Sequence, residues 1–152
     1  MSPEENKAVV RKAIEEVNNR DPAKGVETII DGFTAPDYID HTNQLRGPEG
    51  VKQFYAVFLK AFPDYHRTIE DIIAEGDKVW VHSITTMTHT GKFHGAAPTG
   101  KKITITGVNI YRMVNGKVVE GWNVTDQLDM LKQLGVIEYT EKGKKLFPED
   151  GT

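Results

Sequence analysis

The stretch that decides the fold is THTGKFHGAAPTGKKITITG, residues 88–107, which lies between two segments of alternating apolar residues. A phosphate-binding loop needs glycines that lead directly into the N-terminus of a helix. Here the glycines lead into the strand pattern of residues 103–106. We therefore interpret the stretch as a long hairpin, in which Pro98 stiffens the bend and Phe93 anchors the loop on the rest of the domain.

A metal site at the two histidines of this stretch is disfavoured. His89 and His94 are not spaced as a pair on one helix face, and neither cysteine nor carboxylate accompanies them. The sequence therefore predicts no metal site at these histidines.

Around this hairpin the sequence predicts helices first and strands afterwards. Apolar residues recur at helical spacing to about residue 19, between residues 21 and 36, and from residue 47 to residue 63. From residue 65 the period changes to two, which predicts four strands, followed by a helical turn near residue 130. This order is typical of an α+β fold. We expect N-terminal helices packed on a strongly curved antiparallel sheet, a cone that encloses a pocket.

Composition limits the classes of function. The 152 residues include 19 basic and 22 acidic side chains and no cysteine, for a net charge of -3. No nucleic-acid partner is expected from this balance, and the apolar runs are too short to span a membrane. The N-terminus is charged where a signal peptide needs an apolar core, so we expect a cytoplasmic protein. Residues 1–135 are expected to form one domain, and residues 136–152 a tail that is partly loose or packed on a neighbouring subunit.

The hairpin resembles the pattern T-H-x-G-x-F-x-G-x-x-P-T-G-[KR] of the SnoaL-like polyketide cyclases, in the nuclear transport factor two-like superfamily. Further segments carry the same resemblance, in the same order, over roughly residues 6–135: APDYIDH, GPEGVKQFY, AFPDYHRTIEDIIAEGDKVWV and IYRMVNGKVVEGWNVTDQLDMLKQLG. The resemblance implies a cone with a cavity at its mouth. It also implies an intramolecular aldol ring closure that needs no metal or cofactor.

Strand alternation separates two faces of the sheet but does not say which one is concave. By analogy with ketosteroid isomerases of the same cone, we expect three inward sets: Trp80, His82 and Ile84; Gly107, Asn109 and Tyr111; and Gly121, Asn123 and Thr125. The opposite face is too apolar for free solvent. We therefore expect it to meet a second copy of the chain, in a homodimer or larger homo-oligomer.

The last strand departs from the family pattern. The SnoaL-like cyclases commonly read E-H-W-D there, with the histidine and aspartate facing inward, whereas this chain has glycine at position 121 and Asn123. An amide cannot accept a proton as a carboxylate does. Proton transfer would then fall to His41 or His82, with Asp40 behind them, while Asn109 and Tyr111 polarise a carbonyl.

We therefore expect a small, mostly apolar, carbonyl-containing ligand, and an enolisation-type cyclase or isomerase. The candidate catalytic residues are His41, His82, Asn109 and Asn123; the candidate ligand-binding residues are Trp80, Ile84, Ile105, Tyr111, Phe54 and Phe58. Two alternatives stay open. One is a binding module without turnover, which the amide of Asn123 favours. The other is an interaction protein whose outer sheet carries the function.

Overall fold

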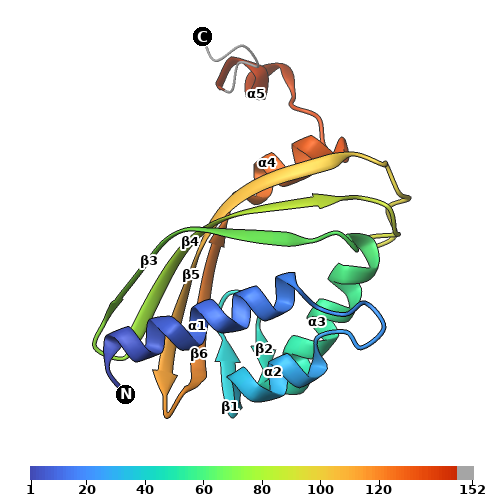
Figure 1. The fold of residues 1–152 in the computed structure, drawn as a ribbon. Coiled ribbons are helices and arrows are strands. Elements are labelled where there is room, and N and C mark those ends of the chain that lie inside the picture. Colours follow the sequence, from blue (N-terminus) through green and yellow to red (C-terminus); the bar gives the residue numbers. More distant parts are fainter. Residues whose placement is uncertain (147–152) are drawn as a thin grey trace.

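The computed structural model describes residues 1–146 and contains five helices and six strands within them. In chain order these are α1 (Pro3–Asn18), α2 (Glu27–Phe33), β1 (Thr34–Asp40), β2 (Leu45–Arg46), α3 (Gly47–Ala61), β3 (His66–Glu75), β4 (Lys78–Thr88), β5 (Lys102–Val114), β6 (Lys117–Thr125), α4 (Gln127–Leu134) and α5 (Glu141–Leu146). Figure 1 shows the long strands β3–β6 curving over the N-terminal helices.

The strands form one sheet in the order β2-β1-β6-β5-β4-β3. Neighbouring strands are antiparallel except at β1 and β6, which run parallel. The α+β class is confirmed, with a mixed rather than a wholly antiparallel sheet. The parallel pairing arises because β1 reaches the sheet directly after α2, from the helical layer, rather than through a hairpin.

Helix α1 packs along the concave side of the sheet. Its N-terminus has a capping box: Ser2 Oγ accepts the N–H of Glu5, and the Glu5 carboxylate accepts the N–H of Ser2, both at 3.1 Å. Val10, Ile14 and Val17 form its buried face. Val10 and Ile14 join Val79 and Val81 of β4 in one core cluster, and Ile14 and Val17 also line the cavity described below.

The hairpin of residues 89–101 is docked on the C-terminal end of α3. The N–H groups of Thr90 and Gly91 both donate to the carbonyl of Ala61, which has no partner within the helix. A Cβ at Gly91 would overlap the Lys60 carbonyl, so only glycine fits there. Phe93 packs edge-on against the rings of Phe58 and Phe62, at 5.8 Å and 5.2 Å. The predicted anchoring role of Phe93 is confirmed.

The C-terminal part of the predicted domain contains α4, as expected, and Asp126 caps it by accepting the N–H of Asp129. Beyond it, α5 occupies part of the predicted tail, and residues 147–152 of that tail lie outside the described part of the chain. No helix within residues 1–146 is both long and apolar enough to cross a bilayer.

Candidate functional site

A cavity of about 550 Å³ lies between the N-terminal helices and the concave face of the sheet. Most of its wall is apolar, with contributions from α1, α2, α3, β1 and α4. Phe54, Val57 and Leu131 are partly exposed and form an apolar rim where the cavity opens. A hollow of this size with a few polar groups is typical of a small-molecule site.

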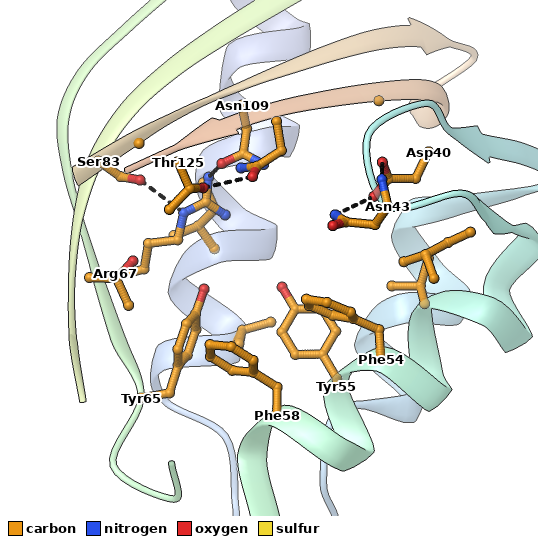
Figure 2. Close-up of a pocket in the computed structure, with 18 of the residues that line it drawn as sticks. Asp40, Asn43, Phe54, Tyr55, Phe58, Tyr65, Arg67, Ser83, Asn109 and Thr125 are labelled. Atoms are coloured by element: carbon orange, nitrogen blue, oxygen red, sulfur yellow. Dashed lines mark hydrogen bonds between the residues drawn. The ribbon is translucent and has the colours of Figure 1, made fainter. Parts of the chain in front are cut away.

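Arg67 is the most unusual polar residue of this wall. It is only 8% exposed, on β3, and all three of its side-chain nitrogens donate to neutral acceptors. Nε donates to Ser83 Oγ at 3.1 Å, one terminal nitrogen to the Tyr111 hydroxyl at 3.3 Å, and the other to Asn109 Oδ1 at 2.6 Å. Figure 2 shows this cluster at one side of the cavity. Because a guanidinium only donates, Asn109 must present its oxygen to Arg67 and keep its NH₂ group free.

The main chain at Arg67 is fixed as well. Asn18 of α1 accepts the N–H of Arg67 at 2.8 Å and donates to its carbonyl at 2.7 Å. Burial by itself lowers the pKa of Arg67, but Tyr111, Tyr65 and Tyr55 offset this, so that the pKa lies above its ordinary value. The guanidinium is therefore a permanent, immobilised positive charge.

Asp40 lies across the cavity from Arg67 (Figure 2) and is the one carboxylate in the described part of its wall. The residue is buried at the end of β1. Its Oδ1 accepts the N–H groups of Thr42 and Asn43 at 2.9 Å, and its Oδ2 accepts the side-chain amide of Asn43 at 3.1 Å. These bonds hold the carboxylate in one orientation and leave Oδ2, which accepts one bond, with lone-pair capacity for a proton.

Tyr38 lies two residues before Asp40 on β1 and lines the same cavity. Its hydroxyl occupies the space beside Gly121, where an added Cβ would overlap it. Burial, and to a smaller extent the negative charge of Asp40, raises the pKa of Tyr38 well above its usual value. Tyr38 is thus a protonated hydrogen-bond donor next to the carboxylate, in the place that a side chain at position 121 would need.

An aromatic wall from α3 and from Tyr65, the residue before β3, closes the cavity between these two polar ends (Figure 2). Phe54 and Phe58 stack at 5.7 Å, and Tyr65 packs edge-on against Phe58 at 5.7 Å and Tyr55 at 6.4 Å. Burial raises the pKa of Tyr55 and of Tyr65. Flat, neutral rings here favour a flat, apolar ligand body.

Six of the predicted site residues line the cavity: Phe54, Phe58, Ile105, Asn109, Tyr111 and Asn123. Asn123 is hydrogen-bonded within β6, where the Thr125 hydroxyl donates to its Oδ1 at 2.7 Å. The side-chain oxygen of Asn109 accepts a hydrogen bond from Arg67.

The predicted inward set on β4 is wrong. Trp80, His82 and Ile84 are not among the residues of the cavity wall, and Trp80 is 47% exposed. The register pairs Val81 with Asn109 and Ser83 with Gly107, so Val81 and Ser83 share the concave face. His82 lies on the other face, with its Nε2 at 3.0 Å from Thr106 Oγ1.

His41 also lies outside the cavity wall, against the prediction. Its side chain is exposed and stacks on Trp122 with the ring centroids 4.9 Å apart. The backbone N–H of His41 donates to the backbone carbonyl of Gly121. The neighbouring Asp40 points inward instead, because successive side chains of a strand point to opposite faces.

The two hairpin histidines differ in environment. His94 lines the cavity, whereas His89 is fully buried. The N–H of Thr99 donates to His89 Nδ1 at 3.2 Å, so the proton of the neutral ring is on Nε2, which has no partner among the described residues. In residues 1–146 no group of three or more histidine, aspartate and glutamate side chains is placed to hold a metal ion.

Sequence reasoning missed Arg67 and Tyr38. One signal for Arg67 was available: alternation in HRTIEDII places it on the same face as the apolar Ile69. Tyr38 had no comparable signal, because its role depends on the close approach of β1 to Gly121.

A family profile described as SnoaL-like polyketide cyclase matches residues 8–134. The chain belongs to this family. Aklanonic acid methyl ester cyclase DauD from Streptomyces sp. (strain C5) is 27% identical over 150 residues, which cover 97% of this chain and 91% of that protein.

Two solved structures agree in fold with this SnoaL-like protein. AclR from Streptomyces galilaeus, a protein assigned as a hydroxylase, is 30% identical and superimposes with a TM-score of 0.79, over 93% of this chain and 87% of AclR. A protein from Jannaschia sp. CCS1, assigned to the SnoaL-like polyketide cyclases, is 26% identical with a TM-score of 0.79, over 91% and 98% of the two chains. The nuclear transport factor two-like fold is thereby confirmed.

Proposed function

We propose that this SnoaL-like protein catalyses an enolisation-type ring closure or isomerisation of a mostly apolar carbonyl compound, with Asp40 as the proton acceptor. The observation that carries the proposal is the position of Asp40: it is buried, fixed by three hydrogen bonds, and the one carboxylate in the described cavity wall. A positioned carboxylate is the group that proton abstraction next to a carbonyl requires.

In the proposed reaction Asp40 accepts a proton from a carbon next to a carbonyl group. The electron pair of the broken C–H bond moves to the carbonyl oxygen, and the Tyr38 hydroxyl donates a hydrogen bond to the resulting enolate oxygen. The enolate carbon then bonds to a second carbonyl carbon of the same molecule. The oxygen of that second carbonyl takes the proton, so the product is an isomer of the substrate and Asp40 is regenerated.

Proton transfer is assigned to Asp40 rather than His41 because the imidazole is exposed and stacked on Trp122, outside the cavity. His82 is excluded as the proton acceptor because its side chain also lies outside the cavity wall, on the other face of the sheet. Asn109, Tyr111 and Asn123 keep a binding role in the proposal, because their free N–H and O–H groups line the cavity. Phe54, Phe58 and Ile105 hold the apolar body of the ligand.

The test is turnover of aklanonic acid methyl ester, the compound in the relatives' names, and of its free acid, followed by liquid chromatography with mass detection. Ring closure gives a new chromatographic peak with unchanged mass. Addition of one oxygen would instead point to the hydroxylase assignment of AclR. Saturable binding with neither product would favour the second candidate, a binding module, for which the observation is the amide of Asn123.

We also propose that the convex face of the sheet meets a second copy of the chain. Ile73, Trp80, Ile110 and Trp122 pair across four neighbouring strands and form one apolar row on that face. Trp80 is 47% exposed and Ile73 is 58% exposed in the single chain. An antiparallel sheet face of this kind fits a symmetric contact between identical faces.

A further inference from the structure

Arg67 is a buried cation without a counter-ion. It is 8% exposed, and no ion pair joins it to an acid in the described part of the chain. Its three nitrogens contact only a hydroxyl of Ser83, a phenol of Tyr111 and an amide oxygen of Asn109. A buried charge is normally paired, because its removal from water costs several kcal/mol.

The guanidinium also has donors to spare. It carries five N–H groups, and the three bonds to protein acceptors leave one N–H on each terminal nitrogen. Arg67 forms part of the cavity wall, and Figure 2 shows it facing Asp40 across the open space. Two free N–H groups on adjacent nitrogens match the two oxygens of a carboxylate.

The carboxylate of Asp40 is on the opposite side of the cavity and is bound to Thr42 and Asn43, so it does not neutralise Arg67. The side-chain bonds of Arg67 to Ser83, Tyr111 and Asn109 hold the guanidinium away from Asp40. The missing negative charge must therefore come with the ligand.

We infer that the substrate carries a free carboxylate, which Arg67 binds at the end of the cavity away from Asp40. The inference rests on the proposed function in taking this cavity as the substrate site, and it adds the charge of the substrate. The ligand class is a flat, apolar ring system with one carboxylate. The relatives are named for a methyl ester, which offers Arg67 no charge.

Binding of a matched pair of probes, 2-naphthoate and methyl 2-naphthoate, tests this without any need for turnover. The two share one ring system and differ in the negative charge. Titration calorimetry at pH 7.5 and fixed ionic strength gives both dissociation constants. The wild-type chain is expected to bind the carboxylate about tenfold to a hundredfold tighter than the ester, the range for a charge-assisted hydrogen bond.

Asn109→Asp is the decisive variant because it keeps the shape of the side chain and places a carboxylate 2.6 Å from the guanidinium. It is expected to remove the preference for naphthoate over the ester, whatever its effect on the affinity for the ester itself. Ser83→Ala is the matched control: it deletes a neutral acceptor of Arg67 without adding charge, so the preference should persist. Circular dichroism and thermal melting establish that both variants are folded.

Equal affinity of the wild type for the two probes, or no binding of naphthoate at millimolar concentration, would overturn the inference. So would a preference that Asn109→Asp leaves intact, because Arg67 would then only link strands β3, β4 and β5. Tighter binding of naphthoate than of its ester, in a protein that shows no turnover of the compounds tested for the proposed function, would contradict the proposed enzyme but support the carboxylate site. Turnover of an ester substrate, with equal affinity for the two naphthalene probes, would support the enzyme but contradict the carboxylate site.

Discussion

The hydroxyl of Tyr38 fills the space that a side chain at position 121 would occupy. Gly121 lies on β6 and Tyr38 on β1, and a Cβ on the glycine would overlap the phenol oxygen. The resemblance to E-H-W-D implies a histidine at this position, and here the tyrosine places a polar group from a neighbouring strand in that space. In the proposed reaction, Tyr38 and Asp40 of this one strand form the reactive end of the cavity.

Gly121→Ala is expected to destabilise the fold by about 1–3 kcal/mol, the usual cost of overpacking a buried site. Tyr38→Phe removes the overlapping oxygen, so the double variant should recover most of that loss. The measurement is the free energy of unfolding in urea for the two single variants and the double variant. Additive losses would show that the two residues do not compete for this space.

How far the sequence predicts the structure differs from strand to strand. Strands β5 and β6 are joined by a tight turn at Asn115 and Gly116, both at positive φ, and their register shifts once, between Arg112 and Met113. Asn109 and Asn123 are paired across these strands and line the cavity, as the analogy with the isomerases led us to expect. Strands β4 and β5 are joined by the long connection 89–101, whose length does not fix the register of the two strands. The face of β4 that was predicted to line the cavity was therefore the wrong one.

The candidate site is less predictable than the fold, because its polar groups depend on contacts between distant segments. Arg67 meets its partners on β4 and β5 only through the sheet register. Asp40 and His41 are neighbours in sequence, and the choice between them depends on which one faces the concave side. Strand alternation shows that Asp40 and His41 face opposite sides of the sheet. Only the placement of β1 beside β6 shows that Asp40 is the one on the concave side.

Gly91→Ala is expected to displace the hairpin 89–101 from the end of α3, because a Cβ at this position would overlap the carbonyl of Lys60. The loss in free energy of unfolding should be about 1–3 kcal/mol. Gly95→Ala is the control: its Cβ meets no neighbour, and only the cost of a positive φ, about 1–2 kcal/mol, remains. Faster amide exchange at Thr90 and Gly91 in the Gly91 variant alone would locate the displacement; unchanged exchange there would contradict it.

Asp64 is expected to stabilise the fold at neutral pH and to lose this effect in acid. Its carboxylate accepts the N–H and the hydroxyl of Thr88, both at 2.6 Å. Burial raises the pKa of Asp64 but these two bonds outweigh it, so the pKa lies below its usual value. The pKa of an aspartate in the unfolded chain is about 3.9. Because the folded-state pKa is lower, the stabilisation is complete above about pH 5 and is lost as the pH falls through the folded-state pKa.

The measurement is the unfolding free energy of the wild type and Asp64→Asn from pH 7 downward. The gap between them should be constant to about pH 5 and then narrow towards zero as the pH falls through the folded-state pKa. A gap that widens in acid would have the wrong sign for this account. Asp71→Asn, on the exposed part of β3, serves as the control for removal of one charge.

The convex apolar row predicts a dimer that a single charge disrupts. Trp80→Glu should convert the wild-type oligomer to a monomer at micromolar concentration, because the introduced carboxylate would be buried in the contact. Leu128→Glu changes an apolar residue of α4, 43% exposed and outside the row, and should leave the mass unchanged. Light scattering coupled to size exclusion reports the mass; a monomeric wild type would contradict the proposed contact.

The most direct test of the account is the ring-closure rate of Asp40→Asn beside Asp37→Asn. Both variants remove one carboxylate charge from β1, but Asp37 is exposed and Asp40 lies in the cavity wall. The amide keeps the Oδ1 bonds of Asp40 to the turn, so its fold should persist. The account predicts a rate lower by about 10²–10⁴-fold for Asp40→Asn and an unchanged rate for Asp37→Asn. An Asp40→Asn enzyme with the wild-type rate would contradict it.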